Sequence, residues 1–251
     1  MQNSNVSHID NYLKYLSFLC LDPTREKWAK HYLASNNGSM LPFTNRVFIP
    51  NIINENDITD LKDFFGEIPF TLWVNKTNNL TNETLEKLGL KLQACFPLME
   101  ADLNSLPPLL TDSPIKIQLL QSKEDIISIW VPIATQAYPK ISISEFQKYI
   151  LYLLSTPEYK NMRFYLGLHD GKPCATSLLI LKKDVAAVHW VGTIPEYRKN
   201  GLGYAISCFP LHEVKHQVSK AILYSSQMGK PLYEKIGFRL VAEACVYGSL
   251  H

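Results

Sequence analysis

The chain has little that would take it to a membrane or to nucleic acid. Its apolar runs fall short of the roughly 18 residues that a membrane-spanning helix needs. The 25 lysines and arginines are nearly balanced by 23 aspartates and glutamates, and the basic residues are dispersed rather than clustered. Because binding to nucleic acid depends on gathered positive charge, we predict no nucleic-acid partner and no membrane span.

Cysteine and histidine are also too scattered to suggest a scaffold. The 5 cysteines show no C-x-x-C spacing, and the 7 histidines do not pair with them at metal-ligand spacing. An odd number of dispersed cysteines favours a reducing compartment without a disulfide framework, and we predict no metal. The N-terminal segment lacks the basic and long apolar stretches of a secretion signal, so we expect a soluble, cytoplasmic protein.

What the sequence does contain is an ordinary globular composition in two parts. With 251 residues, 46% of them hydrophobic, it suits one large or two small domains. The prolines at 107, 108 and 114 have the composition of a linker. We therefore expect an N-terminal α+β domain over 1–106, a linker over 107–114 and a second domain over 115–251.

Hydrophobic periodicity gives a first outline of both parts. In the first, we expect helices over 9–19, 25–33, 58–65 and 83–88, and strands over 46–49, 69–74 and 90–103. In the second, the expected order is β-α-α-β-β-β-α-β-α-β, with a tight hairpin at Asp170-Gly171.

The segment from Val185 to Ile206 has the pattern of an anion site. An apolar strand leads through Gly192 to a basic turn with two glycines, and then to a helical stretch. Glycines let the backbone approach a ligand closely, and the free amides at a helix start favour an anion. The dinucleotide pattern G-x-G-x-x-G fails because its third position is Ile206, and the P-loop pattern fails because Tyr204 follows Gly203.

Two motifs in this part resemble the GNAT acetyltransferase superfamily. One is Arg198-x-x-Gly201-x-Gly203, and the other is Tyr233-x-x-x-Gly237-Phe238 further along the chain. The resemblance covers about residues 115 to 251. It implies the acetyltransferase fold, an α/β (α+β) arrangement with a mixed, twisted sheet flanked by helices.

The resemblance also implies a site for acetyl-CoA as cosubstrate. Tyr233 would be the acid that protonates the departing CoA thiolate, and Arg198 lies at the charged first position of the loop. Many family members carry an asparagine where this chain has Ser226. The residues expected to bind the cofactor are Val191, Gly192 and Thr193 along the pantetheine arm, Arg198, Lys199, Asn200, Gly201, Leu202, Gly203 and Tyr204 around the diphosphate, and Ser226.

Several roles stay open at this point. The general base could be His189, Glu196 or a relayed water. Gly192 suits a β-bulge, but a glycine there could equally mark close packing. Tyr233 could also be a packing residue.

The first half contains a weaker echo of the second. Phe70 to Val74 followed by Leu85 to Leu90 repeats the β–α–β end, with Leu85 at the place of Tyr233 and Leu90 at that of Phe238. No Arg-x-x-Gly-x-Gly precedes it. This pattern suggests a degenerate acetyltransferase-like half that has lost its cofactor loop; the alternative is an unrelated α+β cap.

Taken together, these features predict an N-acyltransferase that moves an acetyl group from acetyl-CoA to an amine acceptor by direct attack. The alternatives are a non-catalytic acyl-CoA-binding sensor, or a nucleotide-binding protein that uses the same loop. The residues name neither the acceptor, nor the acyl-chain preference, nor the oligomeric state.

Overall fold

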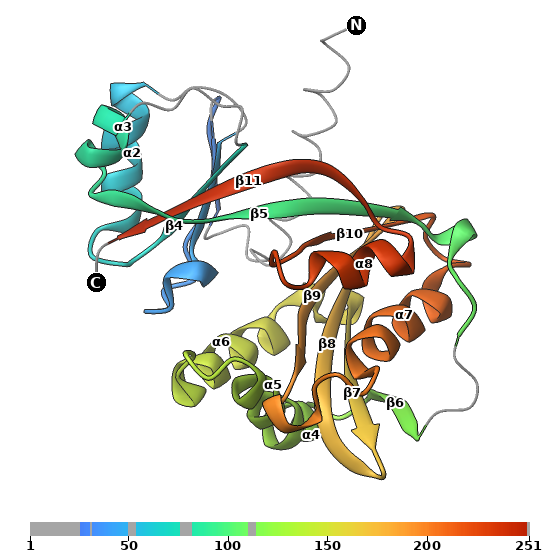
Figure 1. Ribbon diagram of the computed structural model, residues 1–251. Helices are drawn as coiled ribbons and strands as arrows, with labels where there is room; N and C mark the ends of the chain where they lie inside the picture. Colours follow the sequence, from blue (N-terminus) through green and yellow to red (C-terminus); the bar gives the residue numbers. More distant parts are fainter. Residues whose placement is uncertain (1–25, 31, 50–53, 76–81, 110–113, 250–251) are drawn as a thin grey trace, which may run out of the picture. The chain divides into compact units, whose positions relative to one another are not determined.

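The computed structural model describes residues 26–30, 32–49, 54–75, 82–109 and 114–249 (Figure 1). The helix expected over 9–19 lies outside these residues. The chain forms two compact units, one made of Met1–Leu98 with Val241–His251 and the other of Met99–Leu240. Two long strands, β5 and β11, each begin in one unit and end in the other.

In the first unit, short strands and two helices alternate along the chain. Its elements are β1 (Glu26–Trp28), β2 (Leu33–Ser35), a 3-10 turn (Pro42–Thr44), β3 (Arg46–Ile49), α2 (Glu55–Phe65), β4 (Thr71–Asn75), α3 (Asn82–Lys87) and β5 (Leu90–Asp102). β1, β2 and β3 pair antiparallel in sequence, and β3 pairs parallel with β4. A cluster of apolar side chains that includes Leu61, Phe65 and Leu72 forms its core.

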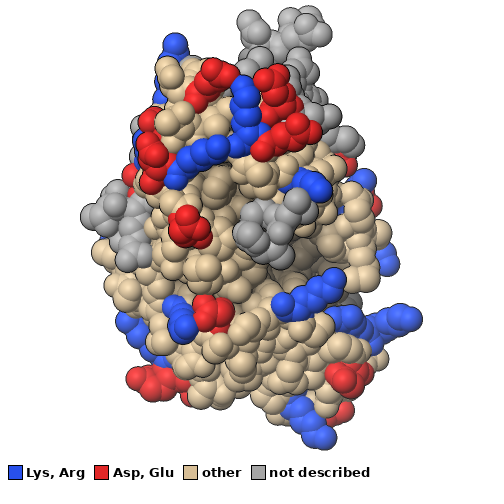
Figure 2. All heavy atoms as spheres, turned by 90° about the vertical axis from the view of Figure 1, so that its left-hand side faces the viewer, with Lys and Arg blue, Asp and Glu red and all other residues tan. Residues whose placement is uncertain are grey.

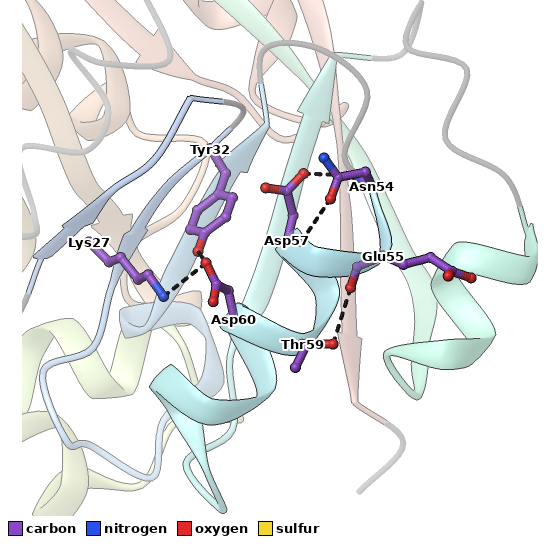
Figure 3. A network of polar contacts seen from close by, with 7 residues as sticks. All are labelled: Lys27, Tyr32, Asn54, Glu55, Asp57, Thr59 and Asp60. Carbon is purple, nitrogen blue, oxygen red and sulfur yellow. Dashed lines mark hydrogen bonds and ion pairs between the residues drawn. The ribbon is translucent and has the colours of Figure 1, made fainter.

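Polar contacts fix helix α2 of this unit at its start and along its side (Figure 3). The Asn54 side chain accepts from the amide of Asp57, whose carboxylate accepts in turn from the amide of Asn54. Asp60 receives the Tyr32 hydroxyl at 3.4 Å and the Lys27 ammonium at 3.2 Å. This capping box satisfies amides that the first turn of a helix otherwise leaves free.

The charges on this part of the surface are mixed in sign. Figure 2 shows acidic and basic side chains interspersed on the face that it presents. Lys87 illustrates the mixture, because its ammonium lies 2.6 Å from the Glu55 carboxylate and 3.1 Å from that of Glu83. The arrangement agrees with the dispersed charge of the sequence.

The helix expected over 25–33 is wrong. Strands β1 and β2 occupy this segment, with Glu26 opposite Ser35 and Trp28 opposite Leu33. β2 then continues the sheet onto β3. A short segment gains more from completing such a ladder than from forming an isolated helical turn, which has a costly nucleus.

The second unit contains the longer strands. Its elements are β6 (Ile115–Leu120), α4 (Lys123–Asp125), a π-helical turn (Ile126–Trp130), α5 (Val131–Ala137), α6 (Ile143–Ser155), a 3-10 turn (Pro157–Asn161), β7 (Met162–His169), β8 (Lys172–Lys182), β9 (Val185–Thr193), a 3-10 turn (Pro195–Tyr197), α7 (Leu202–Val214), β10 (Lys220–Tyr224), α8 (Lys230–Ile236) and β11 (Arg239–Ser249). The order predicted for this half is confirmed.

Helices cover both faces of the sheet in this unit. Figure 1 shows α5 and α6 on one side of strands β7 to β9 and α7 on the other. The buried Trp130 anchors the first side, because its indole N–H donates to the carbonyl of Tyr165 at 3.0 Å. Pro132 sits in the first turn of α5, directly after the π-helical turn, and its missing N–H interrupts the regular helical ladder there.

The two units share a topological repeat. Both show the order β-β-β-α-β-α-β, from β1 to β5 and from β7 to β11, with two antiparallel pairings followed by a parallel one. The last strands are exchanged between the halves: β11 pairs with β4, and β5 is the neighbour of β10. This exchange explains why the units differ from the boundaries expected at 106 and 115, since residues 241–251 join the first unit and residues from 99 join the second.

The expectation of no disulfide is wrong. Cys95 on β5 and Cys245 on β11 form a disulfide within the first unit, across 150 residues of sequence. Their Cα atoms are 4.0 Å apart because the two strands are neighbours in the sheet. Cys174 and Cys208 are free and buried, and Cys20 lies outside the described residues.

Within the described parts of the chain, no helix has both the length and the apolar character to cross a membrane.

Candidate functional site

Strand β9 has an open edge over its second half. It pairs parallel with β10 through the pairs from Val185 with Lys220 to Ala187 with Ile222. Beyond Ala187, β9 continues to Thr193 while β10 ends at Tyr224. The two strands therefore diverge, and the outer half of β9 retains β8 as its paired neighbour.

A β-bulge lies in this outer half. The register with β8 shifts between the pair Leu178 with His189 and the pair Thr176 with Gly192. Trp190 has a φ of 51°, and its carbonyl accepts from the Thr176 hydroxyl at 3.1 Å. A bulge redirects backbone groups that regular pairing would otherwise use.

Gly192 serves close packing rather than the turn of the bulge. A Cβ atom at Gly192 would lie 2.6 Å from the Cβ of Ala137 and 2.9 Å from the Tyr138 ring. The positive φ belongs to Trp190, so the structure supports the packing alternative for this glycine.

Tyr138 joins the end of α5 to the bulge. It is the C-cap residue of α5, and its hydroxyl donates to the carbonyl of Val191 at 2.5 Å. Its ring meets that of Trp190 edge to face, with 5.7 Å between centroids. Burial raises the pKa of Tyr138, the Tyr233 phenol raises it further, and the charge of Arg198 acts in the opposite direction.

The loop before α7 has the backbone geometry of an anion cradle. Lys199 and Gly201 have φ values of 66° and 81°, and α7 begins at Leu202 without a side-chain cap. Within the described residues, the amides from Lys199 to Tyr204 have no acceptor in the chain. Successive free amides at the start of a helix favour an anion.

The second glycine of the loop has a packing role as well. A Cβ atom on Gly203 would lie 3.2 Å from Cδ2 of Leu232 on α8. Gly203 thus lets the start of α7 approach the helix that carries Tyr233.

Arg198 braces this loop from within the chain. Its Nε donates to the carbonyl of Thr193 at 3.0 Å, and a terminal nitrogen donates to that of Ala137 at 3.2 Å. The guanidinium thereby ties the end of β9 to the end of α5.

Tyr233 lies on α8 and is buried. Its side chain is 8% exposed, and its ring meets that of Phe238 edge to face at 5.7 Å. Burial raises the pKa of Tyr233 to about 12, with the facing Ser207 hydroxyl acting in the opposite direction. The phenol is therefore protonated at neutral pH, and it can donate a hydrogen bond.

Ser226 helps to shape the turn that leads into α8. Its hydroxyl accepts from the amide of Gly229 at 3.0 Å, while the residue itself is exposed. The hydroxyl hydrogen can still be donated to a ligand.

The two side chains considered as bases differ in exposure. His189 is half-buried on β9 just before the bulge, and Glu196 is exposed in the 3-10 turn after that strand.

Among its described residues, the first unit shows none of these features at the equivalent places. The start of α2 carries the Asn54 cap and the acidic residues Glu55 and Asp57, where α7 has free amides and a basic loop. Leu85 and Leu90 are buried in its apolar core. An anion would meet like charge at this helix start.

A groove on the surface lies apart from the loop. A surface groove of about 520 Å³ between α4 and α6 is lined by Lys123, Glu124, Ile127, Leu151, Leu154 and Ser155, so it shares no residue with β9, the loop or α8. In the part of the chain that the structure describes, no histidine, cysteine and carboxylate groups gather as metal ligands.

Tyr138 is the site residue that the sequence did not reveal. The signal present is Pro139, which restricts the residue before it and marks the end of the helix at Tyr138. Nothing in the pattern links a residue at a helix end to a carbonyl on β9.

Comparison with known proteins gives similar structures and no sequence match. No family model and no curated protein matches the chain. Its structure is similar to that of a GCN5-related N-acetyltransferase from Kribbella flavida, with a TM-score of 0.69 and 18% identity over 90% of each chain. A functionally unknown conserved protein from Staphylococcus epidermidis has a TM-score of 0.69 and 12% identity over 89% of this chain and 92% of its own.

A tandem GNAT protein from the clavulanic acid biosynthesis pathway is also similar, with a TM-score of 0.57 and 9% identity over 94% of this chain and 87% of its own. These likenesses extend over both units at low identity, so they bear on the fold. The chain therefore has the fold of the GNAT acetyltransferases, a mixed, twisted sheet flanked by helices, as the two motifs predicted.

Proposed function

We propose that the chain is an N-acyltransferase that moves an acetyl group from acetyl-CoA to an amine. The observation that carries the proposal is the set of amides from Lys199 to Tyr204 at the start of α7, which find no acceptor among the described residues. These donors suit the diphosphate of CoA. The fold, which N-acetyltransferases share, supports the same assignment.

The open edge of β9 suits the rest of the ligand. An extended pantetheine arm can pair with free backbone groups as an added strand would. Val191, Gly192 and Thr193 lie where β9 has left β10. An edge-facing amide there would also stabilise negative charge on the thioester oxygen as it develops.

The reaction consists of one bond formed and one broken. The amine nitrogen bonds to the thioester carbon, the carbon–sulfur bond breaks, and the thiolate leaves with the electron pair. Tyr233 donates a hydrogen bond to the departing sulfur, and water takes the proton from the nitrogen. Presenting an alkylamine as the free base at neutral pH costs about 4–5 kcal/mol, because the pH is roughly three units below the pKa of the amine.

The first unit takes no part in holding the cofactor in this proposal. The capping box and carboxylates at the start of α2 fill the place that the loop has in the second unit. We assign this half as an acetyltransferase-like repeat without its cofactor loop.

Release of free thiol from acetyl-CoA, followed over a panel of small amines, amino acids and peptides, tests the proposal. We expect at least one amine to raise the rate above the hydrolysis background. Binding of acetyl-CoA without acceleration by any amine would favour a sensor, and absence of binding would exclude both functions.

A further inference from the structure

The outer half of β9 has its outward-facing acceptors already in use. The carbonyls of Val191 and Thr193 accept from the Tyr138 hydroxyl at 2.5 Å and from Nε of Arg198 at 3.0 Å. The Ile194 amide donates to Cys174 of β8 at 3.0 Å, so alternation turns the groups of Thr193 away from β8. An extended ligand that pairs with β9 here needs backbone carbonyls as acceptors for its own N–H groups. The carbonyls of Val191 and Thr193 already accept hydrogen bonds from within the chain.

Of these two donors, Tyr138 is held by fewer hydrogen bonds. Arg198 makes two hydrogen bonds, to Thr193 and to Ala137, and it bridges two elements. The Tyr138 hydroxyl has Val191 as its partner, and the residue is half-buried at the end of α5. Rotation of one phenol would free the Val191 carbonyl without breaking a ladder of the sheet.

The place of Tyr138 ties this contact to the proposed chemistry. Its ring packs on Gly192 and meets the ring of Trp190 edge to face. The hydroxyl therefore lies at the bulge of β9, on the residues that we assign to the pantetheine arm.

Building on the proposed function, we propose that Tyr138 is a further residue of the acyl-CoA site, which holds the Val191 carbonyl in the free chain and yields it to an amide N–H of the pantetheine arm. The internal hydrogen bond then competes with the ligand. A ligand that carries the diphosphate without the arm does not meet this competition.

The test compares two ligands on the full chain by calorimetric titration. CoA carries the arm, whereas adenosine 3′-phosphate 5′-diphosphate retains the nucleotide and diphosphate alone. Tyr138→Phe keeps the ring on Gly192 and removes the hydroxyl. We expect it to lower the Kd for CoA about threefold to tenfold, the range of a typical hydrogen bond, and to leave the Kd of the armless ligand within about twofold.

The matched control is Tyr159→Phe, since Tyr159 lies in the 3-10 turn after α6, and both Kd values should stay at the wild-type level. An unchanged or higher Kd for CoA in Tyr138→Phe, or an equal shift for both ligands, would overturn the role of Tyr138. If the wild-type chain binds neither ligand, the proposed function fails first, and the role of Tyr138 fails with it.

A second measurement needs no variant. With carbon-13 at the ζ position of tyrosine, CoA should shift the Tyr138 signal of the wild-type chain, assigned by its loss in Tyr138→Phe. The armless ligand should leave that signal in place. A signal that ignores bound CoA would contradict the exchange.

Discussion

The raised pKa of the Tyr233 phenol limits what this side chain can do. The pKa of Tyr233 is about 12 because the side chain is buried, whereas an alkyl thiol such as that of cysteine has a pKa of about 8.5. Complete transfer of the phenol's proton to a thiolate would thus cost about 5 kcal/mol. In the proposed reaction, we therefore expect Tyr233 to assist the departing thiolate by donating a strong hydrogen bond while it keeps its proton.

Tyr233→Phe should separate binding from chemistry. We expect kcat for thiol release to fall about 10- to 100-fold, at the lower end of general-acid effects, because the sulfur loses its donor. The Kd for acetyl-CoA should change less than about twofold, since the loop amides are untouched. Steady-state rates and calorimetric titration measure the two quantities, with Tyr159→Phe as control. An unchanged kcat would remove Tyr233 from the mechanism.

The same tyrosine predicts a dependence of stability on alkaline pH. Its pKa is raised in the folded chain from 10.0 to about 12, so folding favours the protonated phenol. The contribution is complete below pH 10 and is lost as the pH rises toward 12. Between pH 9 and 11, the wild-type chain should lose about 1 kcal/mol more unfolding free energy than Tyr233→Phe does.

Urea unfolding at the two pH values measures this difference. Burial also raises the pKa of other tyrosines, Tyr138 and Tyr165 among them, so their ionisation lowers stability at alkaline pH. This loss occurs in both proteins and cancels in the difference between them. Equal losses in the two proteins would mean that Tyr233 is not buried in its protonated form.

At the scale of elements, the starts of two helices explain why one half of the chain is assigned the cofactor. α7 begins with uncapped amides after Gly201, whereas α2 begins with the Asn54 capping box. Anion binding and capping draw on the same amides, so one excludes the other.

Gly201→Ala tests the shape of the loop. Gly201 has a φ of 81°, which an alanine adopts only with strain, so the variant should turn these amides away and raise the Kd for acetyl-CoA at least about tenfold. Gly171→Ala is the matched control, because Gly171 has a φ of 78° in the hairpin between β7 and β8. Both variants should lose about 1 kcal/mol of stability.

Calorimetric titration and thermal unfolding on both variants complete the comparison. Equal Kd values for Gly201→Ala and Gly171→Ala would show that the loop does not hold the ligand.

The elements that sequence patterns predicted well are those defined by their own residues. β9 over Val185–Thr193 and α8 over Lys230–Ile236 stand at their places in the predicted order, because an apolar run sets the strand and Gly237, with its φ of 101°, ends the helix. The glycines of the loop before α7 were likewise predicted from a short motif of neighbouring residues. The helix expected over 25–33 failed because the pairing of β1 with β2, and of β2 with β3, decides that segment.

The features that escaped prediction depend on residues far apart in sequence. The contact of Tyr138 with Val191 spans 53 residues, and that of Cys95 with Cys245 spans 150. Each exists because the sheet order or a helix end brings the partners together. The place of the bulge at Trp190 likewise follows from register with β8.

At the scale of the whole molecule, the halves are linked through their last strands. β11 pairs with β4 through Gly248 with Thr71 to Ala244 with Asn75, and β5 is the neighbour of β10. Each unit is thus completed by sequence from the other half. The Cys95–Cys245 disulfide closes this arrangement covalently within the first unit.

Loss of that disulfide should lower stability. The bond encloses 150 residues, and chain-entropy reasoning gives up to about 5 kcal/mol, with roughly 2–5 kcal/mol typical for removing a native disulfide. The variant Cys95→Ser with Cys245→Ser should show this loss by urea unfolding in the absence of reductant. With reductant, the wild-type chain should approach the variant, whereas the variant itself should not change.

Peptide mapping without reductant gives an independent check, because the fragments that carry Cys95 and Cys245 should be recovered as one linked species. Recovery of the two fragments separately from oxidised protein would contradict the pairing.

The central claim is that the amides of the loop before α7 bind the CoA diphosphate. Amide nitrogen–proton spectra of the labelled chain during titration with acetyl-CoA test it directly. We expect the largest saturable chemical-shift changes on the amides from Lys199 to Tyr204. Saturation that leaves those amides unmoved, with shifts at the groove between α4 and α6 instead, would contradict it.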